Sequence, residues 1–154
     1  MAVFISSINV PLGYVTPGFP GLYWALSGAP AKYLYYPSDI WRFTVFWVII
    51  FFVAAYTLVG CGLAANMVLR RSRLPALAKR VTFFSRLKPI LIAVSYIIMG
   101  LAQGFIIGAI IGVVLSVIYR AGSLTMNVWV PFCWGLAAIL YHICSSYSTS
   151  LLLI

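Results

Sequence analysis

Three long stretches without a charged side chain alternate with short polar segments along this chain. They begin near Phe43, Pro89 and Val128 and each extends over more than 20 residues. Because about 20 apolar residues in an α-helix cross a hydrocarbon core about 30 Å thick, each stretch can form one span. The pattern predicts an all-α membrane protein with three transmembrane helices, over about residues 43–69, 89–119 and 129–152.

The first 38 residues are also apolar, but five prolines and four glycines interrupt them before any spanning length is reached. The many tyrosines of this segment suit the headgroup layer of a membrane. We predict that residues 1–38 form an aromatic, Pro/Gly-rich interfacial arm, which lies on the membrane or against the helices of a transmembrane domain over residues 39–154. Ser38 or Asp39 is expected to cap the first helix, and Trp41 and Trp47 occupy positions typical of an aromatic belt.

Composition and charge agree with a membrane protein. The sequence is 64% hydrophobic and 7% charged, whereas soluble domains are about one-quarter charged. Ten Lys and Arg residues face one acid, Asp39, and seven of the ten lie in the segment between the first two apolar stretches. These seven are Arg70, Arg71, Arg73, Lys79, Arg80, Arg86 and Lys88.

A basic segment between two spans is typical of a cytoplasmic loop rather than of a nucleic-acid-binding surface. This orientation would place the N-terminus in the lumen, the 70–88 loop and the C-terminus in the cytoplasm, and the seven cations against anionic lipid headgroups. Apolar residues spaced by three and four from Leu74 to Leu87 predict either a short interfacial helix within the loop or an ordinary charged connector.

Small residues recur every fourth position along the second span. The stripe consists of Gly100, Gly104, Gly108, Gly112 and Ser116. Such a stripe lets two helix backbones approach closely in lipid. We expect it to pack against the other two helices of the same chain, with Gly60, Ala64 and Gly135 as facing residues. An interface with a second copy or a partner protein is the alternative.

Two uncharged polar side chains, Gln103 and His142, lie at membrane depth. Interhelical hydrogen bonding is the expected role of both; a proton relay or ligand site around His142, on a face shared with Ser145, Ser146, Thr149 and Ser150, is the alternative. Asp39 has no partner carboxylate, and the three cysteines, Cys61, Cys133 and Cys144, lack metal-ligand spacing. We therefore expect no catalytic site, cofactor or metal.

The second span and its exit, "MGLAQGFIIGAIIGVVLSVIYRAG", resemble the transmembrane protein 170 family through Met99–Gly100, Gly108 and the Tyr119–Arg120–Ala121 exit. "DIWRFTVFW" before the first span and the basic run after "VLRRSR" resemble the fungal branch. Gly104 and Gly112 are departures from this pattern. The resemblance, which covers residues 39–154, implies a three-span protein of the endoplasmic reticulum and nuclear envelope, whose animal members are associated with shaping these membranes.

The first functional hypothesis is therefore a non-enzymatic membrane-organising protein. It acts on the lipid bilayer and its anionic headgroups, with a membrane-protein partner or a homo-oligomer and without nucleic acid. An accessory subunit of a larger membrane complex is the second hypothesis. A small oligomeric transporter is the third, and Gln103 and His142 are its only supports.

Overall fold

The computed structural model describes residue 10 and residues 13–23, 32–73 and 83–151. Its elements in chain order are β1 (Tyr33–Leu34), α1 (Pro37–Arg73), α2 (Phe83–Ala121), β2 (Met126–Asn127) and α3 (Trp129–Leu151). All three helices are long and apolar enough to cross a membrane. The prediction of an all-α membrane protein with three transmembrane helices is thereby confirmed. The interfacial helix expected within the basic loop falls largely on residues outside the described ranges.

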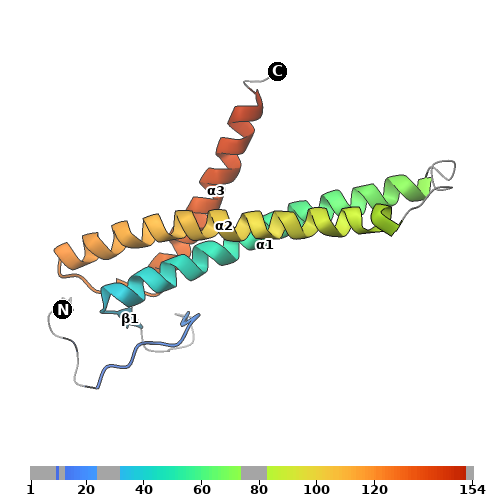
Figure 1. The fold of residues 1–154 in the computed structure, drawn as a ribbon. Coiled ribbons are helices and arrows are strands. Elements are labelled where there is room, and N and C mark those ends of the chain that lie inside the picture. The colour runs from blue at the N-terminus through green and yellow to red at the C-terminus, as the bar shows by residue number, and fades with distance from the viewer. Residues whose placement is uncertain (1–9, 11–12, 24–31, 74–82, 152–154) are drawn as a thin grey trace.

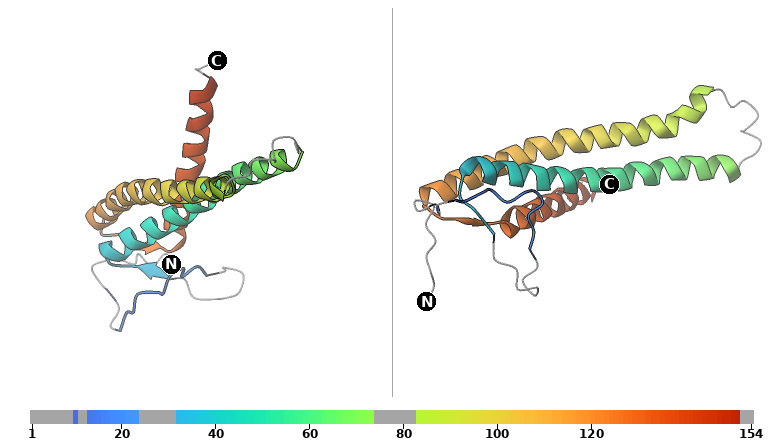
Figure 2. Two further views of the ribbon diagram at one scale, coloured as in Figure 1. Left: turned by 45° about the vertical axis from the view of Figure 1, so that its right-hand side comes forward. Right: turned by 90° about the horizontal axis from the view of Figure 1, so that it is seen from below.

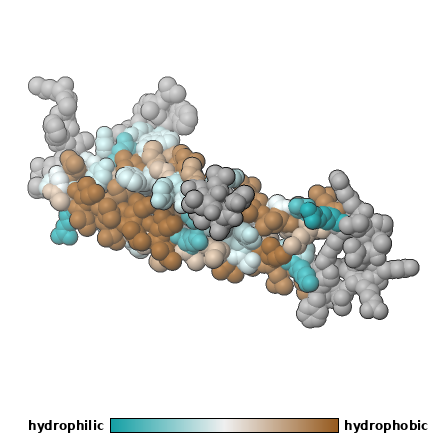
Figure 3. Space-filling model, turned by 90° about the horizontal axis from the view of Figure 1, so that it is seen from above, coloured by the Kyte–Doolittle hydropathy of each residue, from teal (hydrophilic) through white to brown (hydrophobic). Residues whose placement is uncertain are grey.

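Helices α1 and α2 form a long antiparallel hairpin, and α3 crosses it steeply (Figures 1 and 2). Most of the contacts of α3 are with α1 rather than with α2. The C-terminal part of α3 leaves the hairpin, so the helices are closest together in the half of the molecule that contains β1 and β2. Hydrophobic side chains cover most of the face shown in Figure 3, as expected for a surface in contact with lipid.

Helix α1 begins earlier than its sequence indicates. Its first residue is Pro37, and the carbonyl oxygen of Tyr36 accepts hydrogen bonds from the backbone N–H groups of Asp39 (3.0 Å) and Ile40 (3.1 Å). Tyr36 therefore occupies the N-cap position, and the expectation that Ser38 or Asp39 caps the helix is wrong. Proline is favoured at the first helical position because its missing N–H would have no partner there.

The small-residue stripe of α2 faces α1 at four successive turns. A Cβ atom built on Gly108 would lie 3.2 Å from the Cα atom of Val45, and one built on Gly104 would lie 3.1 Å from the Cα atom of Ile49. A Cβ atom built on Gly100 would be similarly close to the Tyr56 side chain. Such separations are too short for ordinary side-chain contact, so the two backbones can approach this closely only because the glycines have no Cβ.

The other end of the stripe contacts α1 as well. A Cβ on Gly112 would lie 2.9 Å from the Cδ1 atom of Trp41, whereas the Ser116 hydroxyl donates a hydrogen bond to the Val113 carbonyl of its own helix (2.9 Å). Gly135 of α3 does not face the stripe as expected; its missing Cβ points at Phe51 and the Trp47 backbone of α1. Helix α1 is therefore contacted by α2 on one side and by α3 on another.

The end of the hairpin near β1 holds a compact apolar core. Leu34 pairs with Met126 in the antiparallel register of β1 and β2, and both side chains are fully buried. Val128, Ile40 and Leu115 complete the contact between strands and helices. The strand pair, which the sequence did not predict, joins the arm to the connection between α2 and α3.

Trp47 belongs to the protein interior rather than to an aromatic belt. It is 9% exposed, and its ring lies between Phe19 of the arm (5.3 Å between ring centroids) and Phe132 of α3 (5.0 Å). Phe51 covers a third side of it. The expectation of a belt position for Trp47 is therefore wrong, because the arm and α3 shield it from lipid.

We predict that Gly108→Val destabilises the protein by about 1–3 kcal/mol, the usual cost of forcing extra atoms into a packed contact. The added side chain would meet the Val45 backbone, which cannot rotate away. Gly62→Val on α1 is the matched control, because nothing lies within 4 Å of a Cβ built there. Thermal unfolding in mild detergent provides the measurement. Equal stability of the two variants would contradict close backbone packing at Gly108.

Candidate functional site

A polar junction joins the three helices near the middle of the hairpin. The Tyr56 hydroxyl of α1 donates a hydrogen bond to the Oε1 atom of Gln103 on α2. The same hydroxyl lies 3.0 Å from the Nε2 atom of His142 on α3. Gln103 immediately precedes Gly104, so the close approach of the two backbones brings its side chain within reach of α1. The His142 ring also contacts Phe52, with 5.2 Å between ring centroids.

The single proton of the Tyr56 hydroxyl sets which atom donates in each contact of this junction. A tyrosine hydroxyl has one proton, and that of Tyr56 is donated to Gln103. The contact between Tyr56 and His142 therefore needs a proton on Nε2 of the imidazole, which donates to the phenolic oxygen. In the neutral ring, Nδ1 is then an acceptor. The arrangement is a chain of hydrogen bonds that ties each helix to the other two through one oxygen atom.

The sequence singled out Gln103 and His142 but missed Tyr56, which links them. The only feature of the sequence that could have pointed to Tyr56 is its hydroxyl, which lies at the centre of the first uncharged stretch. Of the serines expected on the His142 face, Ser146 donates to the His142 carbonyl of its own helix (2.8 Å). The side chains of Thr149 and Ser150 lie outside the described part of the structure.

The described residues contain no group of three or more His, Cys, Asp or Glu side chains that could hold a metal ion. Cys61, Cys133 and Cys144 are free thiols on the outer surface. The junction around Tyr56 joins a hydroxyl, an amide and an imidazole from three helices, an arrangement suited to helix association.

The positive charges are separated into two groups at opposite ends of the hairpin. Arg70 and Lys88 are exposed at the basic-loop end, where the side chains of Arg71, Arg73, Lys79, Arg80 and Arg86 are not described. The remaining three cations, Lys32, Arg42 and Arg120, are exposed near the arm, at the same end as Asp39. Each end therefore carries cations suited to a headgroup layer, but the larger group has no acidic side chain near it in the sequence.

The described part of the N-terminal arm is fixed to the helices by specific contacts. The Asn127 amide donates to the Tyr23 hydroxyl (2.8 Å), and the Trp129 indole N–H donates to the Tyr23 carbonyl (3.0 Å). The Tyr14 hydroxyl donates to the Tyr33 carbonyl (2.8 Å). Burial raises the pKa of Tyr14 above its ordinary value, so this donor stays protonated at neutral pH. The arm thus lies against the helix ends rather than free in solution.

Three apolar helices, a docked aromatic arm and a polar junction at mid-depth define an integral membrane protein with three candidate spans. Residues 33–153 match the Transmembrane protein 170A/B-like family, and the chain belongs to this family. It is 35% identical over 150 residues to the Uncharacterized protein YPR153W of Saccharomyces cerevisiae, and the alignment covers 96% of each chain. No solved structure matches the chain significantly.

We predict that Tyr56→Phe lowers the stability of the protein by about 0.6–1.7 kcal/mol, the range measured for hydrogen bonds between membrane helices. The change leaves Gln103 and His142 without their shared partner. Tyr96→Phe removes the same atom from α2 and is the control, because the Tyr96 hydroxyl has no hydrogen bond among the described residues. Unfolding in a graded detergent mixture provides the measurement. Equal losses for the two variants would show that the junction does not hold the helices together.

Proposed function

We propose that this protein is a non-enzymatic, membrane-organising protein of the endoplasmic reticulum and nuclear envelope, and that it shapes the bilayer. The observation that supports the proposal best is the divergence of the helices. They are joined at the arm end by the β1–β2 pair and its apolar core. Toward its C-terminal end, α3 departs from the hairpin (Figure 1).

Because of this divergence, the protein has a larger cross-section in one leaflet of the bilayer than in the other. Contacts between α1 and α3 advance in the same direction along both helices, from Trp47 with Phe132 to Tyr56 with His142. The free end of α3 therefore points toward the basic-loop side of the membrane. A protein that is wider in one leaflet than in the other favours curvature toward the wider side, and this action requires abundance rather than an active site.

The length of the hairpin adds a second perturbation of the bilayer. Helix α1 has 37 residues and α2 has 39, which correspond to about 55 and 58 Å at 1.5 Å per residue. A hydrocarbon core is about 30 Å thick. The helices must therefore tilt, protrude or thicken the bilayer locally, and each adjustment changes the membrane around the protein.

The orientation that we propose follows from the positive-inside rule. The seven-charge loop faces the cytoplasm, where anionic lipids attract it, and the C-terminus lies on the same side. The aromatic arm then lies at the lumenal interface, where Tyr23 and Trp129 connect it to the helices. In this orientation the wider, basic end of the protein occupies the cytoplasmic leaflet.

A role as accessory subunit is the second candidate, and the surface of α3 favours it. Tyr141 is 77% exposed, although it lies near the middle of its helix. Its hydroxyl has no hydrogen bond among the described residues. A polar group at this depth is stabilised by a partner, and in this role another membrane protein or a second copy of this chain supplies it.

Cysteine labelling tests the orientation. In a variant with the three native cysteines changed to alanine, Ser72→Cys should react with an impermeant maleimide added to sealed reticulum vesicles. Thr16→Cys should react only after detergent opens the vesicles, because the arm faces the lumen. The reverse pattern would contradict the proposed orientation.

A charge-replacement experiment tests membrane shaping. Replacement of Lys79, Arg80 and Arg86 with Gln should weaken the lipid contact of the loop, so this variant should restore reticulum and nuclear-envelope shape poorly in cells that lack the protein. The control carries Gln at Lys32, Arg42 and Arg120, three exposed cations at the opposite end, and should restore shape well. Both variants are compared at equal expression by fluorescence and electron microscopy.

Equal rescue by the two variants would contradict a role of the loop. Normal membrane shape in cells without the protein, together with loss of one specific membrane complex, would contradict membrane shaping and support the accessory-subunit role.

A further inference from the structure

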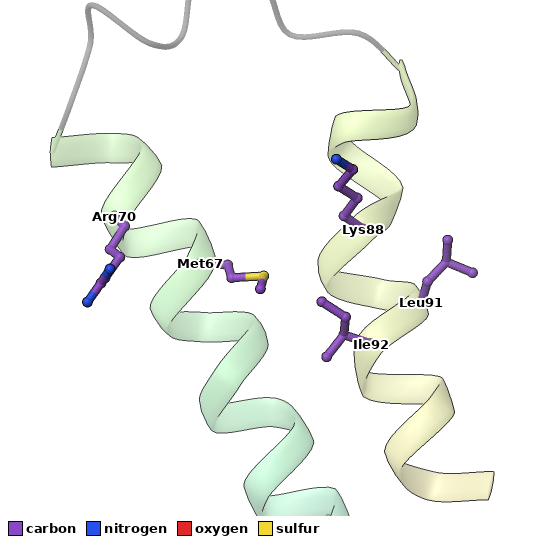
Figure 4. A pocket seen from close by; sticks show the side chains of 5 residues that line it. All are labelled: Met67, Arg70, Lys88, Leu91 and Ile92. Carbon is purple, nitrogen blue, oxygen red and sulfur yellow. The ribbon is translucent and has the colours of Figure 1, made fainter.

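A groove lies between α1 and α2 at the basic end of the hairpin (Figure 4). Its volume is about 440 Å³, and it is lined by Met67 and Arg70 of α1 and by Lys88, Leu91 and Ile92 of α2. Met67 and Ile92 point from the two helices into the space between them. The lining is almost entirely apolar apart from the two exposed cations. In Figure 4 the Lys88 amine points toward the loop, whereas the Arg70 side chain lies on α1 with its guanidinium group directed away from α2.

The groove exists because close backbone packing ends before this point. Among the glycines of α1, Gly60 is the one in close contact with α2, where a Cβ would lie 3.0 Å from the Cβ atom of Tyr96 and 3.4 Å from the Cα atom of Ala93. The two helices separate toward the loop in the right-hand view of Figure 2, which leaves room between them for an occupant.

The depth of the groove suits a lipid. Arg70 is the last residue of the first candidate span, and Lys88 is the second residue of the next one. Both cations therefore stand at the ends of the apolar runs, where a headgroup layer would accommodate them. Met67 lies one turn deeper than Arg70, and Leu91 and Ile92 lie one turn deeper than Lys88, so the apolar lining extends into the hydrocarbon layer. The groove therefore has positive charge at its outer end and apolar surface deeper down. A phospholipid has the matching order, with its phosphate at the outer end and its acyl chain below.

The charges beside the groove favour a lipid with an anionic headgroup. Arg70 and Lys88 come from different helices and are both exposed. The one acidic side chain of the sequence, Asp39, is 31 residues from Arg70 on the same helix, which is about 46 Å at 1.5 Å per residue. No carboxylate side chain is therefore available to neutralise the pair. A guanidinium group binds two phosphate oxygens at once, and an ammonium group adds a compact second charge.

We propose that this groove binds one anionic glycerophospholipid, whose phosphate draws the exposed side chains of Arg70 and Lys88 toward it and one of whose acyl chains lies along Met67 and Ile92. The lipid fills the space that the two helices leave open and provides the counter-ion that the chain lacks. This site requires insertion of the hairpin into a membrane, but it is independent of membrane shaping and of the remaining loop cations.

Native mass spectrometry in mild detergent tests the site with phosphatidylserine and phosphatidylcholine of identical acyl chains. The wild-type protein should retain one phosphatidylserine per chain in preference to phosphatidylcholine. Arg70→Gln with Lys88→Gln should lower phosphatidylserine affinity about thirty-fold, since each cation near a membrane surface contributes about a factor of five. The matched control, Arg42→Gln with Arg120→Gln, changes exposed cations at the far ends of the same two helices and should retain the lipid.

A second pair of variants tests the apolar part of the groove. Ile92→Trp fills the groove while keeping both cations, and it should displace phosphatidylserine. Ile110→Trp, at an outward position of α2 that is 61% exposed, should not. The charge-preserving exchange of Arg70→Lys with Lys88→Arg should keep most of the binding, and circular dichroism verifies the fold of every variant.

The outcomes separate this site from general charge attraction. Phosphatidylserine retention that is unchanged in Arg70→Gln with Lys88→Gln, or equally lowered in Arg42→Gln with Arg120→Gln, would overturn the site. Retention by Ile92→Trp would overturn it as well. None of these results bears on the rescue experiment with Lys79, Arg80 and Arg86, so a failure of the lipid site and a failure of membrane shaping can be told apart.

Discussion

Close approach of the α1 and α2 backbones is the constraint on which the remaining structure depends. Lipid is as apolar as a leucine side chain, so no hydrophobic effect drives two such helices together, and van der Waals contact must hold them. The glycines of α2 provide that contact along one side of α1, where Val45 and Ile49 lie directly beneath them. This arrangement leaves another side of α1, with Trp47 and Phe51, free to receive α3 through Phe132 and Gly135. Helix α1 is therefore the central element: α2 contacts it through the glycine stripe, and α3 contacts it through Phe132 and Gly135.

The extent of the close contact also explains why the two ends of the molecule differ. Near the arm, the helices are close together and their ends support the β1–β2 pair, so Leu34, Met126 and Val128 are fully buried. Toward the loop, Gly60 is the last residue whose missing Cβ is in close contact with α2, and the helices then separate. One end is thus sealed by protein side chains, whereas the other presents cations and an open apolar groove to lipid. The difference follows from where glycines occur in the sequence.

The features that could be predicted from the sequence are those with a local physical cause. Hydrophobic length is such a feature, and the three helices agree with it. The four-residue period of the stripe also correctly indicated small residues on one face of α2. The partners of each face could not be predicted, because they depend on how distant segments meet. Trp47 resembles a belt residue in sequence, but Phe19 and Phe132, 28 residues before it and 85 after it, cover its ring. Gly135 was assigned to the wrong helix for the same reason, and Tyr56 was missed because a single hydroxyl in an apolar stretch has no pattern.

The polar junction between Tyr56, Gln103 and His142 also affects where α3 lies relative to the hairpin. Helix α3 contacts α1 through Phe132 near its start and through His142 ten residues further along. Tyr147, closer to the C-terminal end of α3, is 70% exposed. Because an unpaired polar group in hydrocarbon is costly, the pairing of Tyr56 with His142 fixes the depth at which α3 can leave the hairpin. Sliding of α3 along α1 would break this bond and leave polar groups unpaired, so the bond favours one position of α3 along the hairpin.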